Sequence, residues 1–383
     1  MRGCLDGVRV LELARYQAGP QCGSMLGELG AEVIKVERIG GEETRANPPI
    51  HNGQSIYFAV YNRGKKSITL DLESERGKEL LRKLVKVSDV VLENFRPGIM
   101  EKMGFGFDVL KSINPRIILT RASAGGQYGP YRHRPGFDPL GQAMSGLMYL
   151  TGRSSGSPVR TASSVIDRVT ALHATIGTLA ALLETKVSGR GQVVDVCLMD
   201  TGFRLTEIPL SQYWATHKEP EPGGQTSIQC KDGSVVIVAV TPPQWSRLFS
   251  TIGRPELAND KTFTDASAQN RRLRDDAISQ WAIARTVKEV LRSLEDADVP
   301  VAPVNTIAQA AQDPHLRERE VLVEVEDAGG GKVLVPGLTI KLSETPGRLG
   351  KVPKVGEHND EVLSTILGLS REEIAGLRTE GVV

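Results

Sequence analysis

The sequence predicts an α/β protein in which a large domain with a largely parallel sheet is joined to a smaller α+β domain. Two observations favour this class. Strand-like apolar runs alternate with stretches of helical spacing in the first half of the chain, and this pattern changes after a Pro- and Gly-rich segment near residue 220. The 383 residues also exceed one domain of about 150 residues. We therefore expect a large domain over 1–220, a small domain over 226–330 and a C-terminal segment, 331–383, that returns to the large domain.

The large domain begins as a regular alternation of strands and helices. The expected strands are apolar or alternate between polar and apolar residues, and they lie at 8–13, 32–36, 67–72, 89–92, 116–119 and 193–198. The expected helices carry apolar residues three and four positions apart, and they lie at 23–29, 75–87 and 168–184. Such alternation implies a parallel sheet with helices on both faces.

The segment 218–225 reads Lys-Glu-Pro-Glu-Pro-Gly-Gly-Gln, which cannot continue a helix and marks the domain boundary. Beyond it, the patterns predict strands at 235–240 and 299–304 and helices at 245–252, 270–284 and 287–295. Three glycines at 329–331 predict a hairpin turn between strands at 322–325 and 333–335. Two terminal helices are expected at 360–367 and 370–377.

Composition and charge exclude several classes of protein. The 47 Lys and Arg against 46 Asp and Glu leave a net charge of +1, so no overall field attracts nucleic acid or an anionic membrane, and neither is an expected partner. The richest apolar stretch, 176–183, is much shorter than the ~20 residues of a membrane span. Asp6 precedes any signal-like run, and four scattered cysteines make a poor disulfide framework. We therefore expect a cytoplasmic protein.

Common metal and nucleotide motifs are missing from the sequence. The six histidines lie far apart, without the spacing of metal ligands, so no metal site is expected. The first strand-to-helix turn, 14–20, lacks the pattern GxGxxG, although Glu37 stands where a dinucleotide fold places its ribose-binding acid. A bound dinucleotide is therefore a weak hypothesis, and no permanently bound cofactor is expected.

Several long blocks carry a resemblance to a known family. They read Gln-Ala-Gly-Pro at 17–20, Gly-Ala-Glu-Val-Ile-Lys-Val-Glu at 30–37 and Glu-Asn-Phe-Arg-Pro-Gly at 93–98, with further blocks at 62–68, 114–116, 189–192, 194–196, 299–304 and 356–359. Together they resemble the class III CoA-transferases (CaiB/BaiF-like), which include formyl-CoA transferase, carnitine-CoA transferase and the α-methylacyl-CoA racemases. The resemblance implies a homodimer of two interlocked, ring-like chains, each with a Rossmann-like large domain and a small domain.

Asp167 is the expected catalytic residue. From the residues alone, it directly precedes an apolar helix and would be an N-cap. The resemblance implies that it is also the nucleophile, and the positive end of the helix would favour the ionised carboxylate that attack requires. The implied reaction passes through an aspartyl-acyl anhydride and an aspartyl-CoA thioester. It moves coenzyme A from an acyl-CoA, here expected to be succinyl-CoA, to a free carboxylic acid, here expected to be a dicarboxylate.

The resemblance implies further site residues. Gln17 matches a glutamine beside the active site of formyl-CoA transferase and is a candidate oxyanion donor, although a loop amide that bonds the backbone is an equal alternative. Gly223 and Gly224 resemble the end of a glycine-rich lid loop in that enzyme, or form a simple linker. The acceptor acid is expected near Gln17, Arg15, Tyr16 and the loop 132–140. The implied contacts to coenzyme A are Arg38, Leu72, Asn94, Phe95, Arg96 and Lys102.

Two alternatives to the transferase remain open. The racemase branch uses a His in a Gly-His-Asp block, whereas this chain reads Gly136-Phe137-Asp138, and phenylalanine cannot carry a proton. His133, in the basic run 132–134, keeps that alternative open, since the run either meets an anion or forms a solvated turn. A catalytically silent CoA-binding protein is the third hypothesis, and the presence of Asp167 argues against it.

Overall fold

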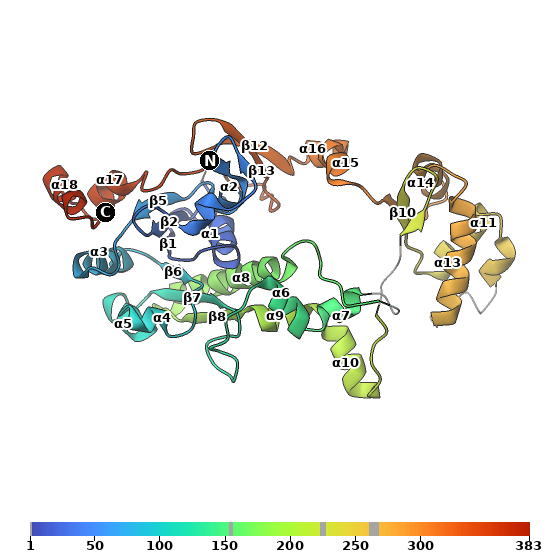
Figure 1. Cartoon of the computed structure of the whole chain (residues 1–383), viewed down its shortest axis with the longest axis horizontal. Helices are drawn as coiled ribbons and strands as arrows, with labels where there is room; N and C mark the ends of the chain where they lie inside the picture. The colour runs from blue at the N-terminus through green and yellow to red at the C-terminus, as the bar shows by residue number, and fades with distance from the viewer. Residues whose placement is uncertain (1, 153–155, 223–226, 260–267) are drawn as a thin grey trace. The chain divides into compact units, whose positions relative to one another are not determined.

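The computed structural model describes residues 2–152, 156–222, 227–259 and 268–383 (Figure 1). The chain divides into two units. The first combines Met1–Pro222 with Arg317–Val383, and the second is Gly223–Leu316. The second unit is therefore inserted between two parts of the first.

The first unit is built on a six-stranded sheet in which every strand pair is parallel. The order across the sheet is β5-β2-β1-β6-β7-β8, so the chain winds outward in one direction from β1 and then restarts beside it with β6. This is the doubly wound, Rossmann-like order, and the predicted α/β class is confirmed. The strands are β1 (Arg9–Glu12), β2 (Glu32–Glu37), β5 (Lys66–Thr69), β6 (Val90–Glu93), β7 (Ile118–Ser123) and β8 (Val193–Cys197).

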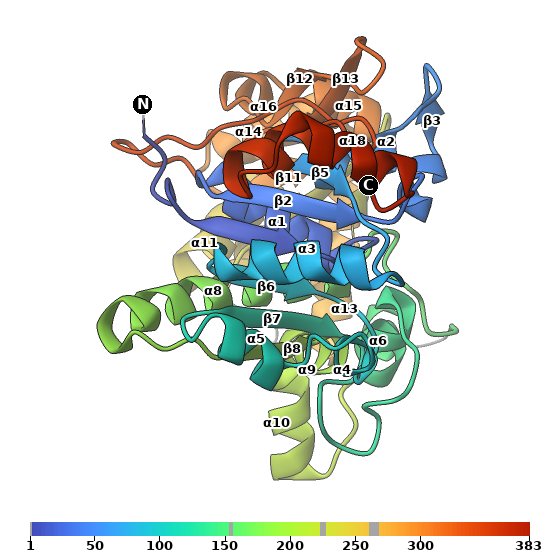
Figure 2. The ribbon, with the colours of Figure 1, turned by 90° about the vertical axis from the view of Figure 1, so that its left-hand side faces the viewer.

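One face of this sheet is covered by helices from both parts of the first unit (Figure 2). Successive residues of a strand point to opposite faces, and on this face Leu11 and Ile34 are fully buried with Phe105 and Leu377. The C-terminal segment thus completes the core of the first unit. The covering helices are α3 (Glu75–Lys86), α4 (Ile99–Lys102), α5 (Phe107–Ile113), α17 (Asn359–Glu361), which continues as a π-helical turn, and α18 (Arg371–Thr379).

The opposite face is covered by α1 (Ala18–Glu28) and α8 (Val165–Ser188). Within the described part of the chain, α8 alone is long and apolar enough to cross a membrane by length and composition, which the expectation from residues 176–183 had overlooked. However, Ala171 and Ala174 are buried against the sheet, and the Thr178 hydroxyl donates to the Ala174 carbonyl at 2.7 Å. This packing is typical of a core helix.

Shorter elements complete the first unit, and sequence patterns missed most of them. The hairpin of β12 and β13 packs Val333 and Val335 against Phe58 of α2, so it belongs to the first unit. The expected small domain over 226–330 therefore extends too far. These elements are α2 (Ile56–Asn62), α6 (Asp138–Met144), α7 (Leu147–Thr151), α9 (Leu198–Leu205), α10 (Glu207–Thr216), β12 (Leu322–Glu326) and β13 (Lys332–Pro336).

The second unit is a small α+β fold with its own core. Its antiparallel strands are ordered β11-β10-β9, and Val235 of β10 is buried with Phe249 and Val290. Pattern analysis found the three helices given below and two of the three strands. The elements are β9 (Ile228–Gln229), β10 (Ser234–Ile237), α11 (Pro242–Thr251), α13 (Ala268–Ala282), α14 (Val287–Glu295) and β11 (Val301–Pro303).

Candidate active site

A cleft of about 970 Å³ lies in the first unit at the carboxyl ends of the parallel strands. Its walls include the residues that directly follow β1, β2, β5 and β6, namely Leu13, Arg38, Leu70 and Asn94. Doubly wound sheets bind their ligands at this edge, where the winding direction reverses. Its volume suits a large organic substrate.

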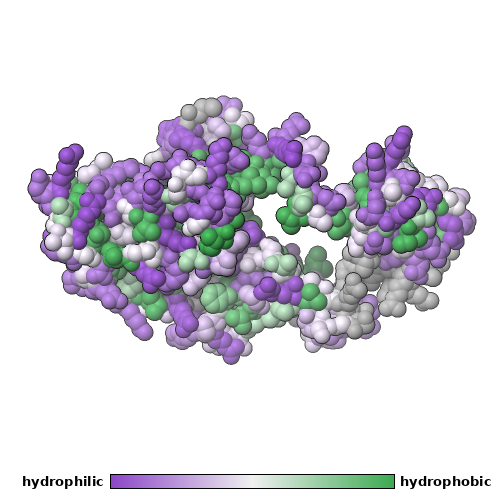
Figure 3. Space-filling view, turned by 45° about the horizontal axis from the view of Figure 1, so that its top comes forward, coloured by the Kyte–Doolittle hydropathy of each residue, from purple (hydrophilic) through white to green (hydrophobic). Residues whose placement is uncertain are grey.

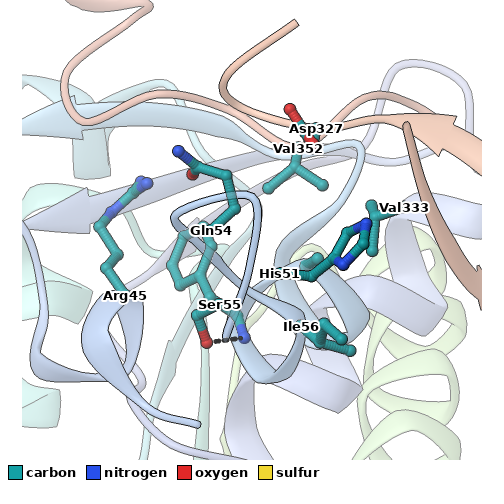
Figure 4. A pocket seen from close by; sticks show the side chains of 10 residues that line it. Arg45, His51, Gln54, Ser55, Ile56, Asp327, Val333 and Val352 are labelled. Carbon is teal, nitrogen blue, oxygen red and sulfur yellow. Dashed lines mark hydrogen bonds between the residues drawn. The ribbon is translucent and has the colours of Figure 1, made fainter. Parts of the chain in front are cut away.

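A second cavity of only about 20 Å³ lies between α2 and the β12–β13 hairpin (Figure 4). It is lined by His51, Gln54 and Val333, and it has room for about one water molecule. The Ser55 hydroxyl beside it accepts a hydrogen bond from the N–H of Phe58 at 3.0 Å and so caps α2. This cavity is too small for a substrate, and the cleft is the candidate site.

Asp167 lines the cleft from the first turn of α8. The N-cap is Ser164, so the prediction that Asp167 caps the helix is wrong. The capping acceptor comes instead from another helix. Oδ2 of Asp138 in α6 accepts hydrogen bonds from the N–H groups of Ile166 at 2.7 Å and Asp167 at 3.3 Å.

The environment of Asp167 opposes ionisation. Burial, and then the negative charge of Asp138, raise the pKa of Asp167 to about 7, while Arg168 pulls it in the other direction. The expected benefit from the end of the helix is therefore outweighed. Near neutral pH, the carboxyl group is poised between its protonated and ionised forms.

Gln17 lies in the wall of the same cleft, on the loop between β1 and α1. Its side chain is buried, and its Nε2 has no hydrogen-bond partner among the residues that the structure describes. Buried polar groups are normally paired, so an amide donor left over at a cleft is suited to a charge carried by a ligand. This geometry favours the oxyanion-donor hypothesis over a loop amide that bonds the backbone.

Two buried lysines hold the Gln17 loop in place. Lys35 donates to the Ala14 carbonyl at 2.9 Å, and Lys65 donates to the Pro20 carbonyl at 2.8 Å. Both ammonium groups also pair with the fully buried Glu12. Burial nevertheless lowers the pKa of Lys65 to about 8. Sequence analysis missed this network, although Glu12 in β1 and Lys35 in β2 are charged residues within largely apolar strands and were a usable signal.

Most of the expected contacts to coenzyme A line the cleft, and one does not. Arg38, Leu72, Asn94, Phe95 and Arg96 all lie in its wall. The exposed Lys102, at the end of α4, is not among the lining residues.

Asn94 has a structural task in that wall. Its amide donates to the Arg15 carbonyl at 2.6 Å and accepts from the Arg15 N–H at 2.8 Å. This paired bond joins the end of β6 to the Gln17 loop, and the Arg15 guanidinium lies 5.4 Å from the centre of the Phe95 ring.

Four arginines line the cleft, and they differ in their ion pairs. Arg15 and Arg38 share Glu43, at 3.2 and 3.8 Å. Arg96 and Arg134 have no carboxylate partner within the described ranges. Of the basic run 132–134, only Arg134 reaches the cleft, while Arg132 bonds the His133 ring at 2.9 Å. Two arginines that have no carboxylate partner in the described structure therefore line the cleft, where they can meet an anionic ligand.

Two tyrosines of α2 lie within electrostatic reach of Asp167 and were overlooked in the sequence. The charge of Asp167 contributes to the raised pKa of both Tyr57 and Tyr61, although burial is the main cause in each case. Their spacing of four residues places them on one side of α2, which was the available signal.

The suggested lid loop and the question of a metal site concern other parts of the chain. Gly223 and Gly224, the suggested lid, lie outside the described residues. In the part of the chain that the structure covers, no group of three His, Cys, Asp or Glu side chains is arranged to hold a metal ion.

Comparisons with known proteins agree over nearly the full length. A family model for CoA-transferase family III matches residues 5–359. The succinyl-CoA–L-malate CoA-transferase beta subunit of Chloroflexus aurantiacus is 38% identical, over 99% of this chain and 98% of its own length. The formyl-CoA:oxalate CoA-transferase of Bradyrhizobium sp. (strain ORS 278) is 34% identical, over 100% of this chain and 98% of its own.

A solved structure leads to the same family. The crystal structure of a CaiB/BaiF family protein from Brucella suis is similar with a TM-score of 0.85 at 33% identity, covering 96% of this chain and 100% of that one. With its parallel sheet, its cleft at the carboxyl ends of the strands and these relatives, the chain belongs to CoA-transferase family III and is a CoA-transferase.

Proposed function

We propose that this CoA-transferase uses Asp167 as a covalent nucleophile to move coenzyme A from succinyl-CoA to a dicarboxylic acid. The observation that carries the proposal is that Asp167 and Gln17 line one cleft, and that Nε2 of Gln17 has no hydrogen-bond partner in the described parts of the chain. A nucleophile and an oxyanion donor in one cleft are the two groups that acyl transfer needs.

The reaction proceeds by exchange of activated acyl bonds. A carboxylate oxygen of Asp167 adds to the thioester carbonyl, the oxyanion accepts a hydrogen bond from Gln17, and the carbon–sulfur bond breaks to release the CoA thiolate. The thiolate then attacks the aspartyl carbonyl of the mixed anhydride. This step expels the donor acid and leaves an aspartyl-CoA thioester.

The second half reverses these steps with the acceptor. The acceptor carboxylate attacks the aspartyl-CoA thioester, which releases the thiolate and forms a new anhydride. Attack of the thiolate on the acceptor's acyl carbonyl gives the new acyl-CoA and regenerates the carboxylate of Asp167. Only the ionised form of Asp167 can begin the cycle, so its raised pKa predicts activity that increases with pH through about 7.

In this proposal, coenzyme A binds at the part of the cleft formed by the residues that follow β2, β5 and β6. Arg38 and Arg96 follow β2 and β6, where their charges can meet phosphates, and Phe95 and Leu72 offer apolar surface to the adenine or pantetheine. The phosphate contact of Lys102 stays a prediction, because this residue does not line the cleft.

The acceptor is assigned to Arg134 and its neighbours. The Tyr16 and Phe137 rings meet edge to face at 5.8 Å, which brings the Gln17 loop and the Arg134 loop together. A dicarboxylate presents one carboxylate to the reaction and a second one to be bound. Arg134, stacked on the Tyr131 ring at 3.9 Å, has no carboxylate partner in the described structure and can bind that second carboxylate. Relatives named for succinyl-CoA and for malate or citramalate support this substrate class.

A homodimer is part of the proposal. Helix α8 presents Ile176, Leu183 and Val187 to solvent, and α10 presents Ile208 and Trp214, all more than half exposed. Apolar side chains reach the surface in several places among polar ones (Figure 3). Exposed apolar side chains of this size on two helices are typical of an interface, and the family resemblance indicates a second copy of the chain as the occupant. Light scattering of the pure protein measures its mass in solution and so tests whether it is a dimer.

The decisive experiment compares Asp167→Ala with Asp200→Ala. Both residues lie in the first turn of a helix, but only Asp167 lines the cleft. We expect Asp167→Ala to abolish transfer from succinyl-CoA to a panel of acids while CoA still binds, and Asp200→Ala to retain transfer. A mass adduct on the peptide carrying position 167 should appear when the enzyme is quenched during turnover. Transfer that survives in Asp167→Ala refutes the assignment.

A second comparison tests acceptor recognition. Arg134→Gln should raise the KM for dicarboxylates about tenfold or more, at the level of a lost charge-assisted hydrogen bond, and should hardly change that for monocarboxylates. The matched control is Arg132→Gln, which changes the same charge outside the cleft. Exchange of the α-proton for deuterium without an acceptor would instead support the racemase alternative.

A further inference from the structure

The start of α8 is held by a side chain from a distant part of the sequence. The side chain of its N-cap, Ser164, makes no capping hydrogen bond in the described structure. The first-turn N–H groups of Ile166 and Asp167 instead donate to Oδ2 of Asp138, 28 and 29 residues earlier. Asp138 is only 3% exposed. A helix is therefore capped by a buried carboxylate that belongs to α6.

The capping carboxylate is itself held by a second buried residue. Oδ1 of Asp138 accepts a hydrogen bond from Nε2 of Gln142 at 2.5 Å, and Oε1 of Gln142 accepts one from the N–H of Thr161 at 3.0 Å. Gln142 has no exposed surface. The segment that enters α8 and the first turn of α8 are thus both bonded to α6, with every polar atom of the pair occupied.

We propose that Asp138, held by Gln142, is a positioning residue for the reaction: it fixes the first turn of α8 so that the Asp167 carboxylate faces the cleft, and it places a second negative charge beside that carboxylate. The inference rests on the proposed role of Asp167 as the nucleophile. Asp138 does not itself contact the reacting atoms, because its two oxygens are bonded to α8 and to Gln142.

The charged groups around Asp167 affect its pKa. Asp138 faces it from α6 and Arg168 from α8, while Tyr57 and Tyr61 face it from α2. After burial, Asp138 is the main reason that the pKa of Asp167 is raised. Removal of that negative charge lowers the pKa of Asp167, so the nucleophile becomes ionised at lower pH. A carboxylate with a pKa near the working pH combines ionisation with nucleophilic strength.

The geometry suggests a pair of variants that separates position from charge. Asp138→Asn alone keeps one acceptor but turns an amide N–H₂ toward the N–H₂ of Gln142, so two donors oppose each other. The double variant D138N/Q142E restores every hydrogen bond. The amide introduced at position 138 would accept from Ile166 and donate to a carboxylate at position 142, which would still accept from Thr161. The negative charge moves from position 138 to position 142, farther from Asp167 along the chain of hydrogen bonds, while the cap of α8 is retained.

We expect Asp138→Asn to lose at least tenfold in kcat, with a smaller change in the KM for acyl-CoA, because the expected CoA contacts lie on other strands. D138N/Q142E should recover most of that loss. Its acid limb of log kcat/KM against pH should move toward lower pH by about half a unit or more. Ser164→Ala is the control: its hydroxyl does not cap α8, so melting temperature and pH profile should match the parent.

Two results would overturn the proposal. Unchanged kcat in Asp138→Asn, with normal folding by circular dichroism, would refute the positioning role. A pH profile of D138N/Q142E that coincides with the parent would refute the electrostatic role. Failure of the nucleophile assignment is recognised separately, since Asp167→Ala would then remain active. The coupling to Asp138 can also be measured without any turnover. For this, the difference in unfolding free energy between proteins with and without Asp167→Asn is followed against pH, once in the parent and once in D138N/Q142E.

Discussion

The raised pKa of Asp167 predicts that this residue lowers the stability of the folded protein at working pH, so that Asp167→Asn is stabilising. The pKa is about 7 in the folded state against 3.8 as the ordinary value. The folded state therefore holds the proton more tightly than the unfolded state. The stability contributed by this group is full below pH 4, falls as the pH rises toward 7 and stays constant above it.

The size of this effect follows from the shift. About three pKa units at about 1.4 kcal/mol each set an upper limit of ~4 kcal/mol. Because the side chain lies at an open cleft and is partly solvated, we expect about 2 kcal/mol at pH 8. Asparagine keeps the shape of the side chain and does not titrate, so the difference between the two proteins isolates this one group.

The assay is urea unfolding of the parent and Asp167→Asn, followed by circular dichroism at five pH values from 4 to 8.5. The free energy of unfolding of the variant, relative to the parent, should increase through this range and level off near pH 7. All other titrating groups are common to both proteins and cancel. A difference that is constant with pH, or that decreases as pH rises, refutes the reasoning.

Three further predictions concern packing and reactivity. A Cβ at Gly191 would lie 1.8 Å from a backbone carbonyl, so Gly191→Ala should unfold at markedly lower urea, whereas Gly376→Ala in α18 meets nothing within 4 Å and should gain about 0.5–1 kcal/mol in the same titration. Iodoacetamide should alkylate the exposed Cys4 and spare Cys22, whose pKa burial raises to about 12; peptide mass spectrometry checks this, and equal labelling contradicts it. Phe249→Ala should cost about 3–5 kcal/mol in the second unit, measured by hydrogen exchange of its amides.

Sequence patterns predicted the sheet well because local signals determine it. Strands such as β1 and β6 are short, apolar and buried on both faces, and few other structures produce that pattern. The start of α1 was placed too late, at residue 23. Pro20 was interpreted as part of a turn, but proline is tolerated in the first turn of a helix, where its missing N–H has no partner to lose.

The environment of the site was beyond local patterns. The cap of α8 is supplied by Asp138, 27 residues before Val165, and no window of sequence connects the two. The pKa of Asp167 depends on burial and on that same distant charge, so the sequence indicated the residue but predicted the wrong direction for its ionisation. Arg134 lines the cleft and its neighbours 132 and 133 do not, and the path of the loop, which local patterns do not predict, decides this difference.

The return of the C-terminal segment has a consequence for biosynthesis. Val382 lies in the same core as Leu11, and its carbonyl accepts a hydrogen bond from the Asp71 N–H at 2.9 Å. A ribosome therefore releases β1 long before the residues that cover it, and translates the whole inserted unit in between. Until residues 359–382 have been made, the apolar side chains of the sheet that they cover stay exposed on the nascent chain, and exposed apolar surface of this kind is prone to aggregation.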